Sequence, residues 1–478
     1  MAKTGPPRDS GLSIDLLRVP GINRFFTWQH ARSALQLPLL VVAALVVYDG
    51  LFGPQIAPRN LAGVAPWVQG RGVAVLALLL AGNLTCMACP FVLSRNLSKR
   101  LLGGRLGWPN WLNAKWLAAG LLIAFFWFYE AFDPWALPWL TAAVAFAYFG
   151  GAFVVNGLFR GMVFCKYLCP LGHFNFVNSL MSPLEVKVRQ LEVCAACRSK
   201  DCIKGRGGFR GCEQWLFQQR KAGNMDCTFC LDCSRACPMD NVGLVARVPG
   251  RDLWEDRPRS GIGRMAERVD LATLVMVVVF GAFMNAFGMV GPFYPLAEGL
   301  AALLGTQSEW VVLLVLFGVG MVLLPLMLVS LVGWASRSLA GSREPILTVV
   351  VRHSYGLIPM GFGMWLAHYA FHFLTGGLTL IPVAQSFLLD VGLPVFGTPH
   401  WGLASLVPAG WLVPIELGLL EMGWLVSLVA SYRIAASQGA RPHTARAAFL
   451  PWALLVTGLF LFGAWLMLQP MEMRGVLA

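Results

Sequence analysis

Long apolar blocks alternate with shorter polar segments along the whole chain. Each block holds about 17 to 29 residues, enough for a helix rising about 1.5 Å per residue to cross a membrane. The chain is 57% hydrophobic and 13% charged, whereas a soluble domain carries about 25% charged residues. The pattern predicts an all-α polytopic membrane protein of about nine transmembrane helices, near 37–53, 71–87, 114–132, 137–163, 269–291, 309–334, 347–375, 411–432 and 448–469.

The basic residues predict how these spans are oriented. With a cytoplasmic N-terminus, all Lys and Arg residues except Arg59, Arg71 and Arg474 fall in cytoplasmic segments, as the positive-inside rule describes. We therefore expect a protein of the bacterial inner membrane, surrounded by lipid, with a periplasmic C-terminus. No cleavable signal precedes the first span, which is expected to be its own anchor. The same rule accounts for the net charge of +13, so a nucleic-acid partner is not expected.

The position of the polar residues along the sequence predicts that the chain is divided into three parts. Residues 182–262 are the one sizeable polar segment and contain eight of the twelve cysteines. They separate an N-terminal four-helix membrane domain, 1–181, from a C-terminal five-helix membrane domain, 263–478. The segment is too short for a large apolar core, so metal sites are expected to supply its stability.

Two runs of cysteines in this segment predict iron–sulfur chemistry. The second run, DCTFCLDCSRACP, has the C-x2-C-x2-C-x3-C-P spacing, and CAACRSKDC upstream is a looser copy. In two-cluster ferredoxins the last cysteine of each run binds the other cluster. By analogy, we expect a cytoplasmic ferredoxin-like insertion with two [4Fe–4S] clusters, one on Cys194, Cys197, Cys202 and Cys237, the other on Cys212, Cys227, Cys230 and Cys233. Structural zinc sites are the alternative.

Two further cysteine pairs are expected at the cytoplasmic face of the membrane. TCMACP supplies Cys86 and Cys89, and FCKYLCP supplies Cys165 and Cys169. Each pair follows a helical hairpin and ends in Cys-Pro, which indicates an internal duplication. Four thiolates at one point suggest a third metal or iron–sulfur centre, or a dithiol redox pair. The alternative is that these residues are merely small buried hydrophobes.

Residues from about 20 to 245 resemble the membrane-bound polyferredoxins of the NapH/NosR type, which serve periplasmic nitrate reductase and nitrous oxide reductase. The cytochrome oxidase accessory polyferredoxins, associated with copper-centre assembly, are more distant relatives. The resemblance implies two [4Fe–4S] clusters on the eight cysteines above and a C-x3-C-P motif at Cys165 and Cys169. The sequence CMACP is one residue shorter than that motif, and the resemblance does not extend to the last five spans.

The seventh span carries a stripe of potential ligands, Met360, Met364, His368 and His372, spaced by four. The eighth span contributes Glu416 and Glu421. Histidine and glutamate can accept the protons of an oxidised quinol, and Met with His can bind copper. Haem is the least favoured cofactor, since His353 and His368 are about 22 Å apart along a helix. Ordinary packing is the remaining interpretation.

These features together predict a membrane-bound electron-transfer protein. We expect electrons to pass between quinol or a cytoplasmic donor and a membrane or periplasmic redox protein, with the chain acting as a quinol-oxidising component of a larger system. The alternative is a factor that reduces copper or assembles a copper centre with the same clusters.

Overall fold

The computed structural model describes residues 14–437 and 441–471 and is mainly helical. Within those residues, eight helical segments are long and apolar enough to cross a membrane. This confirms an all-α polytopic membrane protein. The segments are α2 (Ala31–Phe52), α3 to α4 (Leu61–Ala81), α8 (Pro138–Leu158), α14 (Val269–Phe287), α16 to α17 (Glu309–Leu339), α18 to α20 (Ile346–Asp390), a segment ending with α21 (Ala409–Ala436), and α22 (Pro442–Met467).

The expected third span, 114–132, is not among these eight: it corresponds to α7 (Trp116–Phe132), which is apolar but has only 17 residues. Two helices that the apolar blocks did not predict lie in connecting segments, α15 (Phe293–Leu304) and α20 (Leu380–Asp390). They are short and hydrophobic, so hydropathy alone merges them with neighbouring spans or leaves them in loops.

The helix of the seventh span is interrupted shortly before a proline. α18 (Ile346–Ser354) and α19 (Ile358–Gly376) are joined by a 3₁₀ turn at Tyr355–Leu357, because Pro359 has no N–H to continue the α-helical ladder. Ser427 of α21 donates to the Gly356 carbonyl at 2.6 Å and accepts from the Met360 N–H at 3.1 Å. The neighbouring helix thus satisfies backbone groups left by the interruption.

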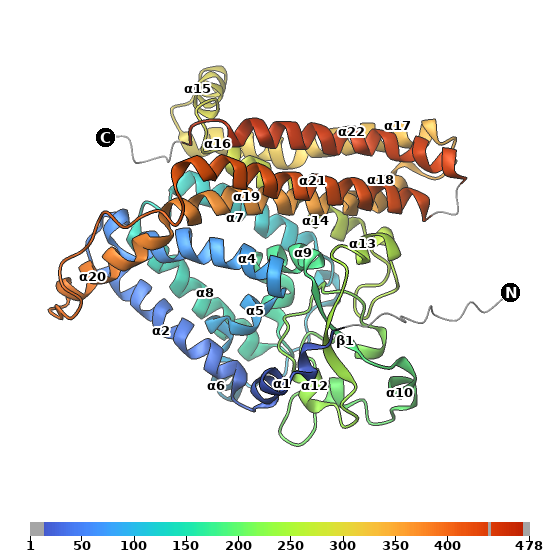
Figure 1. Cartoon of the computed structure of the whole chain (residues 1–478), viewed down its shortest axis with the longest axis horizontal. Coiled ribbons are helices and arrows are strands. Elements are labelled where there is room, and N and C mark those ends of the chain that lie inside the picture. Colours follow the sequence, from blue (N-terminus) through green and yellow to red (C-terminus); the bar gives the residue numbers. More distant parts are fainter. Residues whose placement is uncertain (1–13, 438–440, 472–478) are drawn as a thin grey trace.

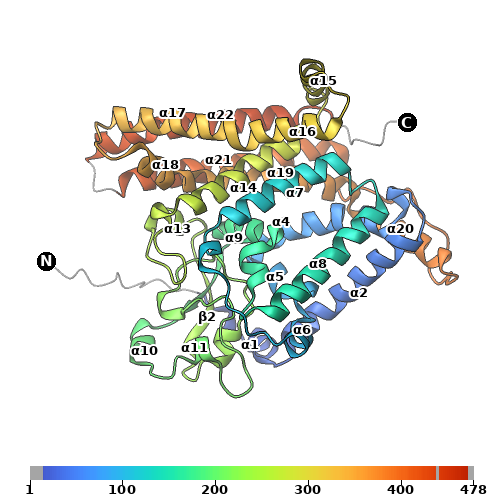
Figure 2. The same ribbon diagram turned by 180° about the vertical axis from the view of Figure 1, so that it is seen from behind.

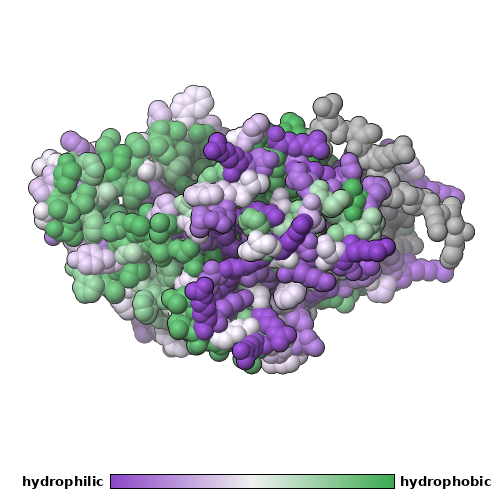
Figure 3. Space-filling model, turned by 90° about the horizontal axis from the view of Figure 1, so that it is seen from below, coloured by the Kyte–Doolittle hydropathy of each residue, from purple (hydrophilic) through white to green (hydrophobic). Residues whose placement is uncertain are grey.

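Most of the long helices pack around one apolar core, and α2 contributes to a separate, smaller core. α19 packs on α21 and α21 on α22, while α2 and α8 form a second pair on the other side of α4 (Figures 1 and 2). One end of the molecule carries the polar insertion and is hydrophilic in the view from below, whereas the opposite end is largely hydrophobic (Figure 3). The division is that expected of a membrane body with one polar end.

The insertion is built on a two-stranded antiparallel sheet. β1 (Leu184–Val188) pairs with β2 (Val242–Ala246) in the register Leu184 to Ala246. All eight cysteines of the insertion lie between the two strands, and the short helices there are α10 (Leu191–Ala196), α11 (Asp201–Lys204) and α12 (Asp232–Ala236). The sheet therefore brings the start and the end of the cysteine-rich segment together.

A buried ion pair attaches the insertion to the membrane helices. Lys115, just before α7, contacts Asp226 with 2.7 Å between Nζ and Oδ1 and also donates to the Lys166 carbonyl at 3.2 Å. Both side chains of the pair are almost fully buried. Burial raises the pKa of Asp226, but Lys115 and Lys166 outweigh it and hold that pKa below its ordinary value. Asp226 immediately precedes Cys227, so the pair positions the second cysteine run.

We predict that Lys115→Ala and Asp226→Ala each destabilise the folded protein by about 3 to 5 kcal/mol, because each leaves an unpaired buried charge. Removing both partners should recover part of the loss. Thermal unfolding in detergent, with limited proteolysis of the insertion, measures the effect. Lys204→Ala removes an exposed lysine and is the matched control. Unchanged unfolding of both single variants would contradict the role of this pair.

Candidate metal centres

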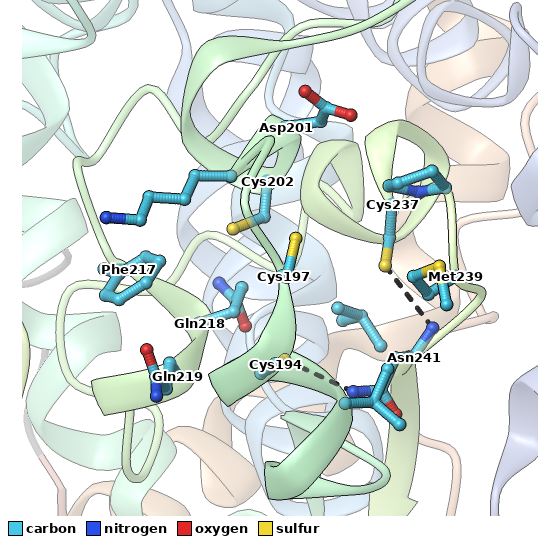
Figure 4. Close-up of a pocket in the computed structure, with 14 residues that line it drawn as sticks. Cys194, Cys197, Asp201, Cys202, Phe217, Gln218, Gln219, Cys237, Met239 and Asn241 are labelled. Carbon is cyan, nitrogen blue, oxygen red and sulfur yellow. Dashed lines mark hydrogen bonds between the residues drawn. The ribbon is translucent and has the colours of Figure 1, made fainter.

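The first predicted group of four cysteines lines one pocket of the insertion. Cys194 and Cys197 come from α10 and its end, Cys202 from α11, and Cys237 from the end of α12. Each lies within electrostatic range of other members of the group. Figure 4 shows the four side chains around the same hollow. The structure thus brings Cys237 of the second run to the three cysteines of the first run, as the crossed pairing predicts.

Asn241 connects these two runs directly. Its side-chain amide donates to the Cys194 sulfur at 3.2 Å, and its backbone N–H donates to the Cys237 sulfur at 3.4 Å (Figure 4). A second amide contact, from Asn241 Nδ2 to the Gln190 carbonyl at 2.7 Å, fixes the start of α10. Sequence reasoning did not find this residue, because it follows the cysteine motif and belongs to no recognised spacing.

The second predicted group is buried beneath the sheet. Cys212, Cys227 and Cys233 belong to one apolar cluster together with Val186 and Leu244 of the strands. Cys233 lies within electrostatic range of all three other members of the group, including Cys230. Cys212 is thereby joined to the second run across a long gap in the sequence, which again agrees with the crossed pairing.

The backbone around these sulfurs adopts unusual conformations. Six of the eight non-glycine residues with positive φ in the described chain lie within three residues of an insertion cysteine. Two of the six direct a backbone N–H group at a sulfur: Phe229 donates to Cys227 and Lys200 donates to Cys197. Successive N–H groups of this kind form concavities that bind anions. Such strain concentrates at functional sites, and here it surrounds the thiols.

Burial controls the ionisation of the second group. It raises the pKa of all four thiols above the ordinary value, and that of Cys212 to about 11, although the N–H groups of Leu216 and Gln214 oppose the shift. Metal-free, these thiols are therefore protonated at neutral pH. A bound metal centre would displace the protons, since the thiolate is the ligand.

The two membrane-face pairs also come together. Cys165 lies within electrostatic range of Cys86, Cys89 and Cys169, and Cys169 within range of Cys86 and Cys89. The pairs come from α5 (Leu84–Ala88) and from the turn Phe164–Leu168, which follow α4 and α8. The structure thus places the four cysteines of the two pairs in one group.

As the side chains stand in the described residues, no three His, Cys, Asp or Glu groups could hold a single metal ion. Within the described chain, the cysteines are free rather than paired in disulfides. The donor set of each group is four thiols with inward N–H groups. This set of donors fits an anionic cluster of several metal atoms. The ligands of such a cluster bind different metal atoms around its outside, so they lie farther apart than the ligands of a single ion.

The predicted residues of the C-terminal spans lie in four environments. His368 and His372 are buried side by side, with ring centroids 5.0 Å apart. Met360 and Met364 are fully buried in the apolar core. Glu416 lies on the buried face of α21 with one carboxylate oxygen lacking a hydrogen-bond partner. Glu421 lies on the exposed face of α21, so the structure does not bring it to the others.

A polar group that sequence reasoning missed lies beside the two histidines. Arg71 of α4 donates to the Tyr129 hydroxyl at 3.0 Å and stands over the rings of Tyr129 and Tyr369. It lies within electrostatic range of both His368 and His372. The sequence did contain one indication of this group: Arg71 is one of the few basic residues outside the segments predicted to be cytoplasmic.

The fold and the cysteine groups define this chain as a cysteine-rich polytopic membrane protein. It is similar to the putative electron transport protein YccM of Escherichia coli (strain K12), with 26% identity over 189 residues, covering 34% of this chain and 51% of YccM. The chain thus spans about half the length of that relative. No family model matches the chain, and no solved structure matches it.

We predict that mild oxidation of the metal-free protein in detergent forms disulfides within each group rather than along each run. Cys237 should cross-link to Cys194, Cys197 or Cys202, because its sulfur faces that pocket and disulfides need close sulfur atoms. Mass spectrometry of the digested protein identifies the pairs, and Cys237→Ser is the control. Cross-links of Cys237 to Cys227 or Cys230 instead would contradict the crossed arrangement.

Proposed function

We propose that this chain is a membrane-bound iron–sulfur electron-transfer protein with two cytoplasmic [4Fe–4S] clusters. The observation that carries the proposal is the crossed assembly of the two cysteine runs into two groups of four. Crossed ligation is the arrangement of two-cluster ferredoxins. The electron-transport name of YccM agrees with this role, as does the resemblance to the membrane-bound polyferredoxins.

The surroundings of the sulfurs support clusters rather than inert thiols. The Cys194 group receives N–H groups from Asn241 and Lys200, and hydrogen bonds to sulfur are one determinant of the reduction potential of a cluster. The Cys212 group is more deeply buried, with three of its four cysteines inside the core of the insertion. The two groups therefore offer different environments, and two clusters held there would differ in potential.

The donor that we propose is quinol, with a redox protein of the membrane or the periplasm as partner. The basic cytoplasmic segments support an inner-membrane orientation with the insertion inside. His368 and His372 lie in the opposite half of the helices from the insertion, together with Arg71 and Tyr369. Unpartnered ring nitrogens on both histidines are suitable acceptors for the protons that leave an oxidised quinol.

The crossed ligation is tested by single cysteine variants. Cys237→Ser and Cys194→Ser should each lose the same cluster, and Cys212→Ser and Cys230→Ser the other, with about four iron and four sulfide lost in each case. Anaerobic iron and sulfide analysis with EPR after dithionite reduction is the measurement. The residual EPR spectrum of Cys237→Ser should match that of Cys194→Ser.

Two results would overturn the proposal. One is a residual spectrum of Cys237→Ser that matches Cys230→Ser, which would place Cys237 with its own run. The other is stoichiometric zinc without sulfide in the wild-type protein, which would make the groups structural zinc sites.

The quinol step is tested in the membrane helices. His368→Gln and Glu416→Gln should lower the rate of cluster reduction by a reduced quinol about 100-fold, because general acid–base groups contribute that order of magnitude. Reduction by dithionite should be unchanged. Glu421→Gln, on the exposed face of the same helix, is the matched control. Stoichiometric copper lost in Met364→Leu and His368→Gln, without a quinol response, would favour the copper-assembly alternative.

A further inference from the structure

We infer that Cys86, Cys89, Cys165 and Cys169 hold a third iron–sulfur cluster, placed between the second cytoplasmic group and the membrane helices. The inference goes beyond the two clusters of the proposed function, and it rests on that function only for the identity of the neighbouring centre. It is supported by the geometry of the two Cys-Pro motifs and by the positive charge of Arg32 beside them.

The two halves of the duplication present their second cysteine in the same way. Cys89 accepts N–H groups from Phe91 and Val92, and Cys169 accepts them from Leu171 and Gly172, with 3.2 Å from the Gly172 nitrogen to the Cys169 sulfur. In both motifs proline follows the cysteine and supplies no N–H, so the next two residues are the donors. Two equivalent sulfur cradles of this kind favour a shared anionic centre over two unrelated cysteines.

Buried polar contacts hold the pairs against each other. Asn175 of α9 (Pro170–Asn178), the helix that begins after Cys169, donates to the Cys86 sulfur at 3.3 Å. Gln36 of α2 donates to the Met87 carbonyl at 3.0 Å and so fixes the turn between Cys86 and Cys89. At Gly172, a Cβ atom would lie 3.0 Å from the Cys165 carbonyl oxygen. Glycine at this position therefore lets the start of α9 pack closely on the turn that carries Cys165, within the second motif.

Arg32 supplies a positive charge at this group. It lies within electrostatic range of Cys86, Cys89 and Cys165, and of Cys230 in the second cytoplasmic group. It contacts Asp232 at 3.5 Å, and its Nε atom is buried without a hydrogen-bond partner. Four thiolates around an iron–sulfur core leave a net negative charge, which a nearby guanidinium stabilises in a medium of low dielectric constant. Two pairs of protonated thiols would not require such a charge.

The group also adjoins the second cytoplasmic group. Asn83, three residues before Cys86, donates to the Cys227 carbonyl at 2.7 Å, and Cys86 lies within electrostatic range of Cys227. Gly82 approaches Phe229 so closely that a Cβ atom would lie 2.6 Å from its ring. A centre here would exchange one electron at a time with its neighbour: one cluster is oxidised as the other is reduced, and no bond forms or breaks.

The experiment compares the anaerobically purified wild-type protein with Cys86→Ala/Cys165→Ala. The wild type should hold more than the about eight iron atoms of two cubanes, and the double variant should fall to about eight. One EPR signal should disappear while the two cytoplasmic signals remain. Cys212→Ser, which removes a cytoplasmic cluster, should retain the third signal and is the matched control.

A second variant tests the third cluster without removing any of its cysteine ligands. Arg32→Gln should lower the midpoint potential of the third signal and of the Cys212-group signal, but leave that of the Cys194 group unchanged, in a redox titration followed by EPR. Arg32→Lys should restore most of the shift. Arg24→Gln changes an exposed arginine on the neighbouring helix α1 (Pro20–Thr27) and should have no effect.

The outcomes separate this inference from the proposed function. About eight iron in both the wild type and the double variant would overturn the third cluster and leave the two cytoplasmic clusters standing. A disulfide among these four cysteines in the anaerobically purified wild-type protein, before any metal is removed or oxidant added, would overturn it in favour of a dithiol pair. Iron and sulfide near zero in the wild type would overturn the proposed function itself.

Discussion

The buried ion pair between Lys115 and Asp226 is the constraint on which the arrangement of the cysteines depends. Lys115 precedes a membrane helix, Asp226 precedes Cys227, and the carbonyl that Lys115 also contacts belongs to Lys166, next to Cys165. One ammonium group therefore sets the spacing between a membrane-face cysteine and an insertion cysteine. Two buried charges cost several kcal/mol to desolvate and repay it only in good geometry, so the pair fixes one arrangement rather than adding much stability.

A second constraint is local and lies in the backbone. Phe229 and Leu231 adopt positive φ on either side of Cys230, although side chains other than glycine are strained there. The Phe229 N–H thereby reaches the Cys227 sulfur. An apolar insertion core would not need this strain, because Leu231 and Phe229 could be buried in ordinary conformations. The loop is shaped around its sulfurs, and the two strands close it at its ends.

The sequence-based prediction succeeded where a short pattern carries the information. Apolar blocks located most of the membrane helices, and the analogy with two-cluster ferredoxins assigned Cys237 to the first run, whose pocket it lines. It failed for contacts between distant residues. Lys115 and Asp226 are 111 positions apart, and neither lies in a motif. Arg32 and Asn175 show no periodicity, and the interruption at Tyr355–Leu357 depends on one proline inside an otherwise unbroken apolar block.

The cysteines and the buried group of Arg71, His368 and His372 are separated along the helices, and aromatic side chains fill the space between them. The cysteine pairs follow the ends of α4 and α8, while Arg71 begins α4 and His368 and His372 lie in the last turns of α19. Phe174 of α9 packs on Trp365 with ring centroids 5.1 Å apart, Trp365 packs on Tyr369 at 5.0 Å, and Arg71 stands 5.0 Å from the Tyr369 ring centroid. Aromatic contacts thus run without a gap from the helix after Cys169 to the buried arginine. Because α9 also holds Cys86 through Asn175, the cysteine group and the side chains around Arg71 are joined by one continuous series of packed helices and rings.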